Sequence, residues 1–312
     1  MRNAFADELL KVSRENENII MLSADIGNRL FDNFKQEFPD RFYNCGVAEA
    51  NTIGVAAGLS LSGFHPIAYT ITPFITFRCT EQIKIDLCYH NLPSIVVGVG
   101  AGLSYSSLGS THHSCEDVGV LKNFPNLTII CPGDANEVRA SLRAALKHNG
   151  PVYIRLGKKG EPIVHQTIPD FSIGKGIVLR EGEDVCILST GTILPTSVEV
   201  AKKLEEQNIT SKLVSLHTIK PLDGELLAQI VKKFKLIVTL EEHSLIGGLG
   251  SSIAEWMMDH DSTSQIKLLR FGTPDEFPKT VMSKEKAHDC FGLTPEAITK
   301  RIRSWLEDKH EN

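Results

Sequence analysis

The chain has 312 residues, a length typical of two globular domains. Hydrophobic residues make up 42% and charged residues 23%, which excludes the compositions of disordered, collagen-like and coiled-coil proteins. The net charge of −5 comes without a basic tract, so we expect no nucleic-acid partner. No apolar run has the length of a membrane span and the start predicts an amphipathic helix, so we expect no membrane contact and a cytoplasmic location.

Apolar runs of strand length alternate with helical patterns along the first half of the chain. After the helix at the start, the pattern predicts strands at residues 18–25, 66–71, 93–100 and 127–132. Helical patterns accompany them at residues 46–63, 77–89 and 135–149. Central strands of a parallel sheet are covered on both faces and read as continuous Val, Ile and Leu, as these do. The order therefore predicts parallel β-α-β units.

A looser stretch at residues 158–178 interrupts this rhythm, and the alternation then restarts. Strands are predicted at 184–191, 211–219, 235–243 and 266–271, and helices at 194–207, 223–234, 251–259 and 294–308. We predict an α/β protein of two doubly wound open sheets, with domains at 1–160 and 176–312 and a linker at 161–175. Because ligands of such sheets bind beyond the carboxyl ends of the strands, loops that follow strands are the places to look for a site.

Two corners between a strand and a helix contain glycine. GGLGSS, at 247–252, opens a helix, where backbone amides can bind phosphate. It does not complete GxGxxG, and no acidic residue follows at the distance of a ribose contact, so we interpret it as a tight turn. In PGDANE, at 132–137, Asp134 or Asn136 is expected to cap the following helix. Neither corner is expected to carry chemistry.

Glu49 is the ionisable residue in FYNCGVAEANTIGVAAGL, a small and apolar run at 42–59 that predicts the start of a buried helix. Burial would remove water from the carboxylate and raise its pKa, unless a cation or a hydrogen-bond donor compensates. A glutamate in the first turn of a helix is also a common way to meet the helix dipole. On this residue alone, a functional and a structural interpretation are equally supported.

Two further loops carry aromatic or ionisable side chains. Phe74 and Phe77 are three residues apart at the start of a predicted helix, so they share one face, as core residues or as an apolar slot for a flat ring. His112 and His113 lie in the polar loop 108–117, and adjacent side chains point in different directions, so at most one faces a given ligand. No further ligands stand at suitable spacing, and we predict no metal bound by this chain alone.

Read together, these motifs strongly resemble the C-terminal half of transketolase, particularly the form split over two polypeptides. The resemblance is collinear over essentially the whole chain, through FYNCGVAEANTIGVAAGLSLSG, PFITFRCTEQIK, GSTHHSCEDVGVLKNFPNLTIICPGDANE and GPVYIRLGKKG. The second domain agrees, since LREGEDVCILSTG, HTIKPLDGELL and VTLEEHSLIGGLGS also resemble 1-deoxyxylulose-phosphate synthase and its relatives. The resemblance implies a pyrimidine-binding domain followed by a transketolase C-terminal domain.

The resemblance implies dependence on thiamine diphosphate and assigns cofactor-binding residues. Glu49 falls on the family's glutamate that hydrogen-bonds the aminopyrimidine ring and activates the cofactor. Phe74 and Phe77 fall in the aromatic segment that lies against this ring. Asp25, in LSADIG, matches an aspartate at the boundary between cofactor and neighbouring subunit.

The resemblance also assigns substrate-binding residues, with departures from the usual pattern. His112 matches the family's THQ histidine near the reacting oxygens, and Lys158 stands where many relatives carry a phosphate-binding arginine. The usual loop resembles THxxxxVGEDGPTHQ, but here Gly100 replaces its histidine, and Ser107 and Leu108 replace its acidic pair. We therefore expect a less hydroxylated or otherwise modified sugar. Arg29 and Asn28 lie in the loop after Asp25. They are candidates for contacts to an anion or a hydroxyl group of the substrate that differ from those of the usual loop.

The motif GDG, through which the family holds the diphosphate and its Mg²⁺ (or Ca²⁺), does not occur. The resemblance therefore implies a separate N-terminal transketolase subunit that carries it, in an α2β2 assembly acting on small sugars. Three alternatives stay open: a 1-deoxyxylulose-phosphate-synthase-like carboligation from pyruvate, for which Arg78 is noted; the β subunit of a 2-oxoacid dehydrogenase E1 component; and a catalytically idle interaction subunit. Retention of Glu49 argues against the last.

Overall fold

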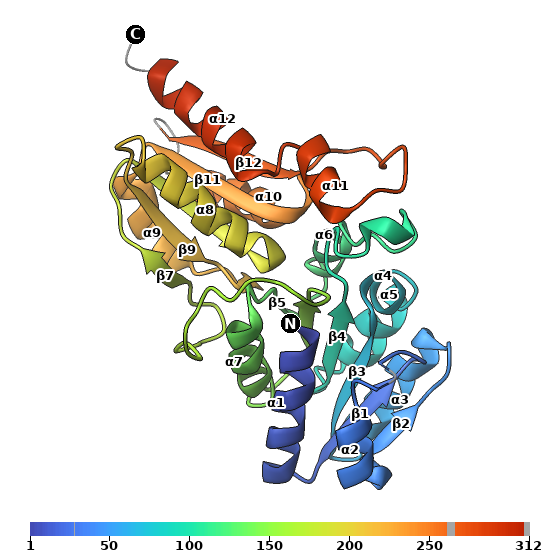
Figure 1. The fold of residues 1–312 in the computed structure, drawn as a ribbon. Coiled ribbons are helices and arrows are strands. Elements are labelled where there is room, and N and C mark those ends of the chain that lie inside the picture. Colours follow the sequence, from blue (N-terminus) through green and yellow to red (C-terminus); the bar gives the residue numbers. More distant parts are fainter. Residues whose placement is uncertain (28, 261–265, 309–312) are drawn as a thin grey trace.

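The computed structural model describes residues 1–27, 29–260 and 266–308. In these residues the chain forms one sheet of seven strands and one of five, each flanked by helices (Figure 1). The doubly wound α/β architecture predicted from the sequence is confirmed. None of the helices in the described ranges combines the length and the apolar character needed to cross a membrane.

The first sheet has the strand order β10-β5-β6-β4-β3-β1-β2, in which the edge strand β10 is Thr218–Lys220. Six of its strands run parallel: β1 (Ile19–Ser23), β2 (Phe42–Asn44), β3 (His65–Ile71), β4 (Ile95–Val99), β5 (Thr128–Ile130) and β6 (Val152–Leu156). Strands β1 and β4 are buried along their whole length, as a continuous apolar pattern requires.

Helices cover both faces of this sheet (Figure 1). One face is packed by α1 (Arg2–Glu15), α2 (Asp32–Glu37) and α7 (Ala135–Ala145). The other face is packed by α3 (Glu49–Leu61), α4 (Thr72–Thr76), α5 (Thr80–Gln82), the π-helical η2 (Ile83–Tyr89) and α6 (Asp117–Leu121). Helix α7 begins where Asp134 accepts hydrogen bonds from the amides of Asn136 and Glu137, so Asp134 is the cap that the sequence left undecided.

The second sheet has the order β12-β11-β8-β9-β7. Its strands are β7 (Ile177–Arg180), β8 (Val185–Thr190), β9 (Ser211–Ser215), β11 (Leu236–Ser244) and β12 (Lys267–Thr273), and its helices are α8 (Leu194–Glu205), α9 (Gly224–Lys233), α10 (Leu249–Asp259), α11 (Lys284–Cys290) and α12 (Pro295–Asp308). Strand β7 is antiparallel to β9, whereas the other pairs are parallel.

Besides the linker, a strand and a hydrophobic cluster join the two domains. The sequence predicts a single strand at 211–219, but this prediction is wrong: β9 ends at Ser215, and β10 (Thr218–Lys220) crosses over to pair with β5 of the first sheet. One hydrophobic cluster also joins α3 and β3 of the first domain to β8, α9 and α10 of the second. The loops at this junction are therefore fixed by both domains.

The sequence predicts a buried helix at the start of α3, but α3 is buried on one face only. Ile53, Ala56 and Ala57 face the core, whereas Val55 and Leu61 are exposed. Cβ atoms added at Gly54 or Gly58 would meet nothing within 4 Å. An apolar helix face that this chain leaves open thus begins next to Glu49.

Candidate active site

Glu49 begins helix α3, and its residue is only 5% exposed. The first turn of a helix favours negative charge, so the backbone stabilises the carboxylate there. Just before it, Gly46 has φ of +72°, and a side chain at that position would meet nothing within 4 Å. Glu49 is therefore both buried and in an N-terminal turn, with open space beside the turn.

The aromatic segment lies beside this carboxylate. Arg78 places Nη1 3.3 Å from both carboxylate oxygens of Glu49, and its guanidinium lies 4.3 Å from the centre of the Phe74 ring. Phe74 is half-buried and Phe77 is 38% exposed. Among the described residues, neither ring belongs to a buried hydrophobic cluster, which argues against core packing as their role.

The two adjacent histidines point in different directions. The ring of His112 lies 5.2 Å from that of Phe74, edge to face, and its Nδ1 is 3.0 Å from the hydroxyl of Thr111. His113 is buried, with Nε2 3.3 Å from the carbonyl oxygen of Ser106. His112 is therefore the histidine that faces the aromatic segment, an alternative that the sequence left open.

Lys158 follows β6 and lies next to the loop at residues 100–117, which we call the histidine loop. Its Nζ is 4.8 Å from the centre of the Tyr105 ring, which in turn lies 6.3 Å from the ring of His112. Ser107 and Leu108 belong to the short helix η3 (Ser106–Leu108), and Leu108 is exposed. A continuous row of contacts therefore links Glu49 to Lys158 through four side chains, two from residues 74–78 and two from the histidine loop.

Asp25 lies directly after β1 and is exposed. Its carboxylate accepts a hydrogen bond from the side-chain amide of Asn44 at 3.0 Å, and its own amide donates to the Asn44 oxygen at 3.1 Å. The backbone of Asp25 has φ of +51°, which this reciprocal pair holds in place. Strands β1 and β2 are neighbours, so the contact fixes their two carboxyl ends together.

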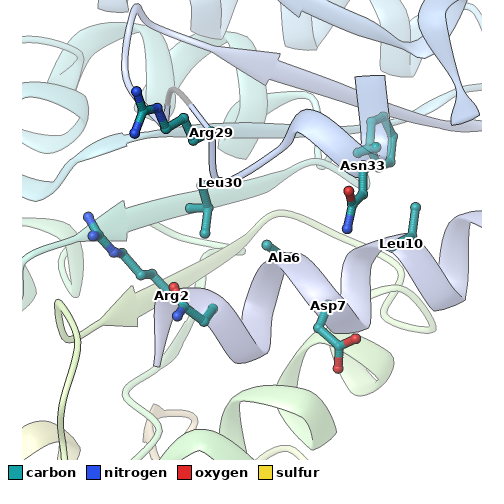
Figure 2. A pocket seen from close by; sticks show the side chains of 10 residues that line it. Arg2, Ala6, Asp7, Leu10, Arg29, Leu30 and Asn33 are labelled. Atoms are coloured by element: carbon teal, nitrogen blue, oxygen red, sulfur yellow. The ribbon is translucent and has the colours of Figure 1, made fainter. Parts of the chain in front are cut away.

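Arg29 lines a cavity of about 550 Å³ between α1 and α2. Arg2, at the start of α1, lines the same cavity, and Figure 2 shows both guanidinium groups at one end of it. Burial raises the pKa of the Tyr105 phenol, and the positive charge of Arg2 opposes this shift. Arg29 therefore stands near a second cation, whereas Asn28, the other candidate in this loop, lies outside the described residues.

Glu242, in β11, anchors the histidine loop to the second domain. Its carboxylate is buried and accepts from the amide of Leu103 at 3.1 Å and the hydroxyl of Thr192 at 3.0 Å. From α11, His288 and Lys284 lie 2.5 Å and 2.8 Å from Oε1. Burial would raise the pKa of Glu242, but Lys284 and His288 outweigh burial and hold it well below its usual range.

The glycine-containing turn at residues 247–252 binds the side chain of Glu241. Glu241 accepts the amides of Leu249 and Gly250 at 2.6 Å and 2.8 Å, at the start of α10. A Cβ at Gly248 would lie 1.9 Å from the Glu241 carboxylate. The interpretation as a closely packed turn therefore fits, because a carboxylate already occupies the amides that a phosphate would need. Within the described ranges, no cluster of three or more His, Cys, Asp or Glu side chains can hold a metal ion.

Sequence reasoning missed three residues of this site, namely Arg2, Tyr105 and Glu242. Each acts through contacts between segments far apart in the chain, as with Glu242 and Leu103. One signal was available for Glu242: a charged pair, Glu241 and Glu242, interrupts an otherwise apolar strand. Buried charges are rare without a partner, so such a pair indicates contacts to other segments.

Comparison with known families identifies both domains. The transketolase pyrimidine-binding domain matches residues 1–161, and the transketolase C-terminal domain matches residues 174–298. The chain is 35% identical to a 6-deoxy-6-sulfo-D-fructose transketolase subunit of Clostridium sp. (strain MSTE9) over 314 residues, which is 99% of this chain and 95% of that protein.

Two further comparisons show which share of related proteins the chain matches. It is 35% identical to 1-deoxy-D-xylulose-5-phosphate synthase 1 of Geobacter sulfurreducens over 298 residues, 93% of this chain but 46% of that protein. A solved structure described as a split gene transketolase, inactive beta4 tetramer, superposes with a TM-score of 0.86 at 35% identity, covering 97% of this chain and 96% of that one. The chain belongs to the transketolase family and consists of its pyrimidine-binding and C-terminal domains.

Proposed function

We propose that the chain is the C-terminal subunit of a thiamine-diphosphate-dependent transketolase. It transfers a two-carbon ketol unit from a ketose, or ketose phosphate, to an aldose. The observation that carries the proposal is the buried carboxylate of Glu49, which is joined through Arg78 to the half-buried ring of Phe74 and through it to His112.

The residues around Glu49 fit the aminopyrimidine half of thiamine diphosphate. A buried carboxylate can share a proton with a ring nitrogen, and the accessible faces of Phe74 and Phe77 offer a flat apolar wall. The open space beside Gly46 leaves room next to the carboxylate. When bound, thiamine diphosphate supplies the carbon nucleophile that takes up and releases the two-carbon unit.

The chain's own residues divide the remaining work. Glu49 holds the ring-nitrogen proton, and Arg78 neutralises the carboxylate while the site is open. His112 donates hydrogen bonds to oxygens of the sugar and moves a proton there. Lys158, over the Tyr105 ring, binds an anionic group at the far end of the substrate, and Arg29, with Arg2 beside it, is a second candidate for such a contact. Asp25 contacts the cofactor at the subunit boundary.

A partner subunit completes the site. The chain lacks GDG, so we propose that an N-terminal transketolase subunit holds the diphosphate and Mg²⁺ (or Ca²⁺). Exposed apolar side chains lie just before and on α3, at the end of α4 and on η2, and we assign them to the surface that meets this partner: Val47, Val55, Leu61, Phe77, Ile85 and Tyr89. Two such pairs would form α2β2.

The substrate is a modified, anionic sugar in this proposal. Gly100, Ser107 and Leu108 present no acidic or imidazole group where the usual loop has them. The relative from Clostridium is described as acting on 6-deoxy-6-sulfo-D-fructose, a sugar with a sulfonate in place of a hydroxyl. The two arginines and Lys158 favour a substrate of the same anionic class.

A second candidate function is carboligation from pyruvate, as in 1-deoxy-D-xylulose-5-phosphate synthase. The observation that favours it is Arg78, a half-exposed cation beside Glu49 that can pair with the carboxylate of pyruvate. The comparison with the Geobacter enzyme gives the same percentage identity as that with the sulfosugar transketolase.

The test is to purify the chain with the product of a neighbouring gene that carries GDG. Binding of thiamine diphosphate to the complex is measured by calorimetry, and donor consumption is followed with hydroxypyruvate and with pyruvate. We expect cofactor binding only in the complex and turnover with hydroxypyruvate. Turnover with pyruvate alone would favour the second candidate, and absence of binding in the complex would contradict both.

A further inference from the structure

Arg155, in β6, is a cation buried at the junction of the two domains, with a side chain that is 2% exposed. Its Nε donates to both carboxylate oxygens of Asp117 in α6, at 2.8 Å and 3.1 Å. Burial would raise the pKa of Asp117, but the charge of Arg155 and its hydrogen bonds outweigh burial and lower the pKa. Asp117 therefore stays ionised and holds one edge of the guanidinium.

The other edge of the guanidinium reaches the histidine loop and the second domain. Its Nη2 donates to the carbonyl oxygen of Ser114 at 2.5 Å and to that of Glu242, in β11, at 3.0 Å. Arginine makes these contacts together with the pair to Asp117 because its donors stand at fixed positions on a planar fork. A lysine ammonium is a single point and cannot reach the Asp117 carboxylate and both carbonyls at once. Arg155 therefore joins α6, the histidine loop and the second sheet through one side chain.

Ser114 is the residue at which the two stems of the histidine loop meet. Its amide donates to the Gly102 carbonyl at 2.9 Å, and its carbonyl accepts from the Gly102 amide at 3.0 Å. With Arg155, this carbonyl accepts two hydrogen bonds, one for each lone pair. The next carbonyl, that of Cys115, accepts from the amide of Ser244 at the end of β11 at 2.6 Å. Because His112 lies two residues before Ser114, a shift of the Ser114 carbonyl would move the backbone that carries the His112 ring.

We propose that Arg155 is a positioning residue for the transfer reaction, which ties the Ser114 carbonyl to β11 and thereby sets where the ring of His112 stands. This ring lies 5.2 Å from that of Phe74, beside the proposed cofactor pocket. A shift of about 1 Å in a group that acts on the reacting atoms lowers a rate by about a hundredfold. The inference rests on the proposed role of His112. It gives the second domain a part in the reaction, although the side chains assigned to the cofactor and the sugar all come from the first.

The experiment uses the complex with the GDG-bearing partner and measures kcat and KM for hydroxypyruvate. Arg155→Lys keeps a positive charge beside Asp117, so the fold is retained, but the ammonium cannot also hold the Ser114 carbonyl. We expect kcat to fall by about tenfold to a hundredfold. KM should stay within about threefold of wild type, because the surroundings of Glu49 and Lys158 are unchanged. A kcat within about twofold of wild type would overturn the inference.

Tyr153→Phe is the matched control, because Tyr153 stands on the same strand and donates its hydroxyl to the same carboxylate of Asp117, at 2.6 Å. Removal of the hydroxyl should lower Tm, since a buried hydrogen bond is lost. It leaves Arg155 on the Ser114 carbonyl, so kcat should stay within about twofold of wild type. Equal falls in kcat for Tyr153→Phe and Arg155→Lys would show that the contacts only stabilise the fold, which would overturn the inference.

A measurement without turnover separates this inference from the proposed function. NMR of the full chain with isotope-labelled histidine reports the ring of His112, whose signals are assigned by their loss in His112→Ala. The Phe74 ring shifts these signals, and Phe74→Leu gives their unshifted position. In Arg155→Lys the His112 signals should move toward this reference, and in Tyr153→Phe they should keep the wild-type position.

The outcomes are distinguishable. Signals that move in Arg155→Lys, in a complex that transfers no ketol unit, would contradict the proposed function and leave the placement of His112 by Arg155 supported. Wild-type signals in Arg155→Lys would overturn the inference, whatever the activity.

Discussion

Arg78 lies 3.3 Å from both carboxylate oxygens of Glu49, yet the arginine side chain is 53% exposed while the glutamate is buried. Exposed ion pairs contribute little free energy, so Arg78 can move aside at small cost. The carboxylate itself cannot leave, because helix α3 begins at that residue. A fixed buried acid with a displaceable counter-ion suits a site that opens and closes around a ligand.

Glu49→Gln removes the charge and keeps the size of the side chain. We expect turnover of the complex to fall at least about a hundredfold, since the amide cannot share a proton with a ring nitrogen in the same way. The fold should persist, because Arg78, which pairs with Glu49 among the described residues, can turn to solvent. Turnover, circular dichroism and Tm measure these outcomes.

The matched control is Glu199→Gln, a change at an exposed glutamate on α8 that pairs with Lys202. It should leave both turnover and Tm near wild type. Activity of Glu49→Gln equal to that of this control would show that Glu49 has no part in the reaction.

The two histidines are expected to separate catalysis from stability. His112→Ala should lower kcat by about tenfold to a hundredfold with little change in Tm, because the side chain is accessible and contacts Phe74 and Thr111. His113→Ala should lower Tm, because the buried ring meets the carbonyl of Ser106 inside the loop. Donor turnover and thermal unfolding of both variants test the assignment. Loss of turnover in His113→Ala and loss of stability in His112→Ala would exchange the two roles.

The sequence predicts the periodic and local features well. Alternating patterns identify most strands and helices, and the helical pattern at 46–63 contains α3, which begins at Glu49. Contacts such as Tyr105 against Gly100 depend on how a loop folds back on itself, which no periodicity records. The crossing of β10 to the first sheet is missed for a similar reason, since Leu216 and His217 continue the apolar pattern between the two strands.

Glu242→Ala is expected to loosen the histidine loop. The change leaves the Leu103 amide and the Thr192 hydroxyl without an acceptor and removes the counter-charge of Lys284. Breaking one side of a buried charged network costs about 3–5 kcal/mol, so urea unfolding should show a loss of this order. Hydrogen exchange at the Leu103 amide should accelerate beyond the global change.

Glu285→Ala is the control for this prediction, since Glu285 is an exposed neighbour on α11. It should leave stability within about 0.5 kcal/mol of wild type. Protection of the Leu103 amide that survives in Glu242→Ala would show that the loop is held by other contacts.

The linker between the domains is expected to carry a pH-dependent contribution to stability. His165 is buried between two carboxylates, with Nδ1 3.3 Å from Asp134 and Nε2 3.6 Å from Glu137. Burial alone would lower the pKa of His165, but the hydrogen bond that its ring donates to Asp134 and the charge of Glu137 outweigh burial and raise the pKa. Burial would likewise raise the pKa of Asp134, but His165 and three backbone amides lower it to about 2.

The sign follows from the direction of the His165 shift. A pKa that is higher in the folded chain stabilises it fully below the unfolded value of 6.5, and this stabilisation is lost as pH rises through the folded value. The free energy of unfolding should therefore decrease above pH 6.5, with a slope of at most about 1.4 kcal/mol per pH unit for one proton. His165→Gln should flatten this slope, and His90→Asn, at an exposed histidine, should retain it. Urea unfolding between pH 6 and about pH 8.5 gives this slope for wild type and for both variants. Equal slopes in wild type and His165→Gln would assign the pH dependence to another group.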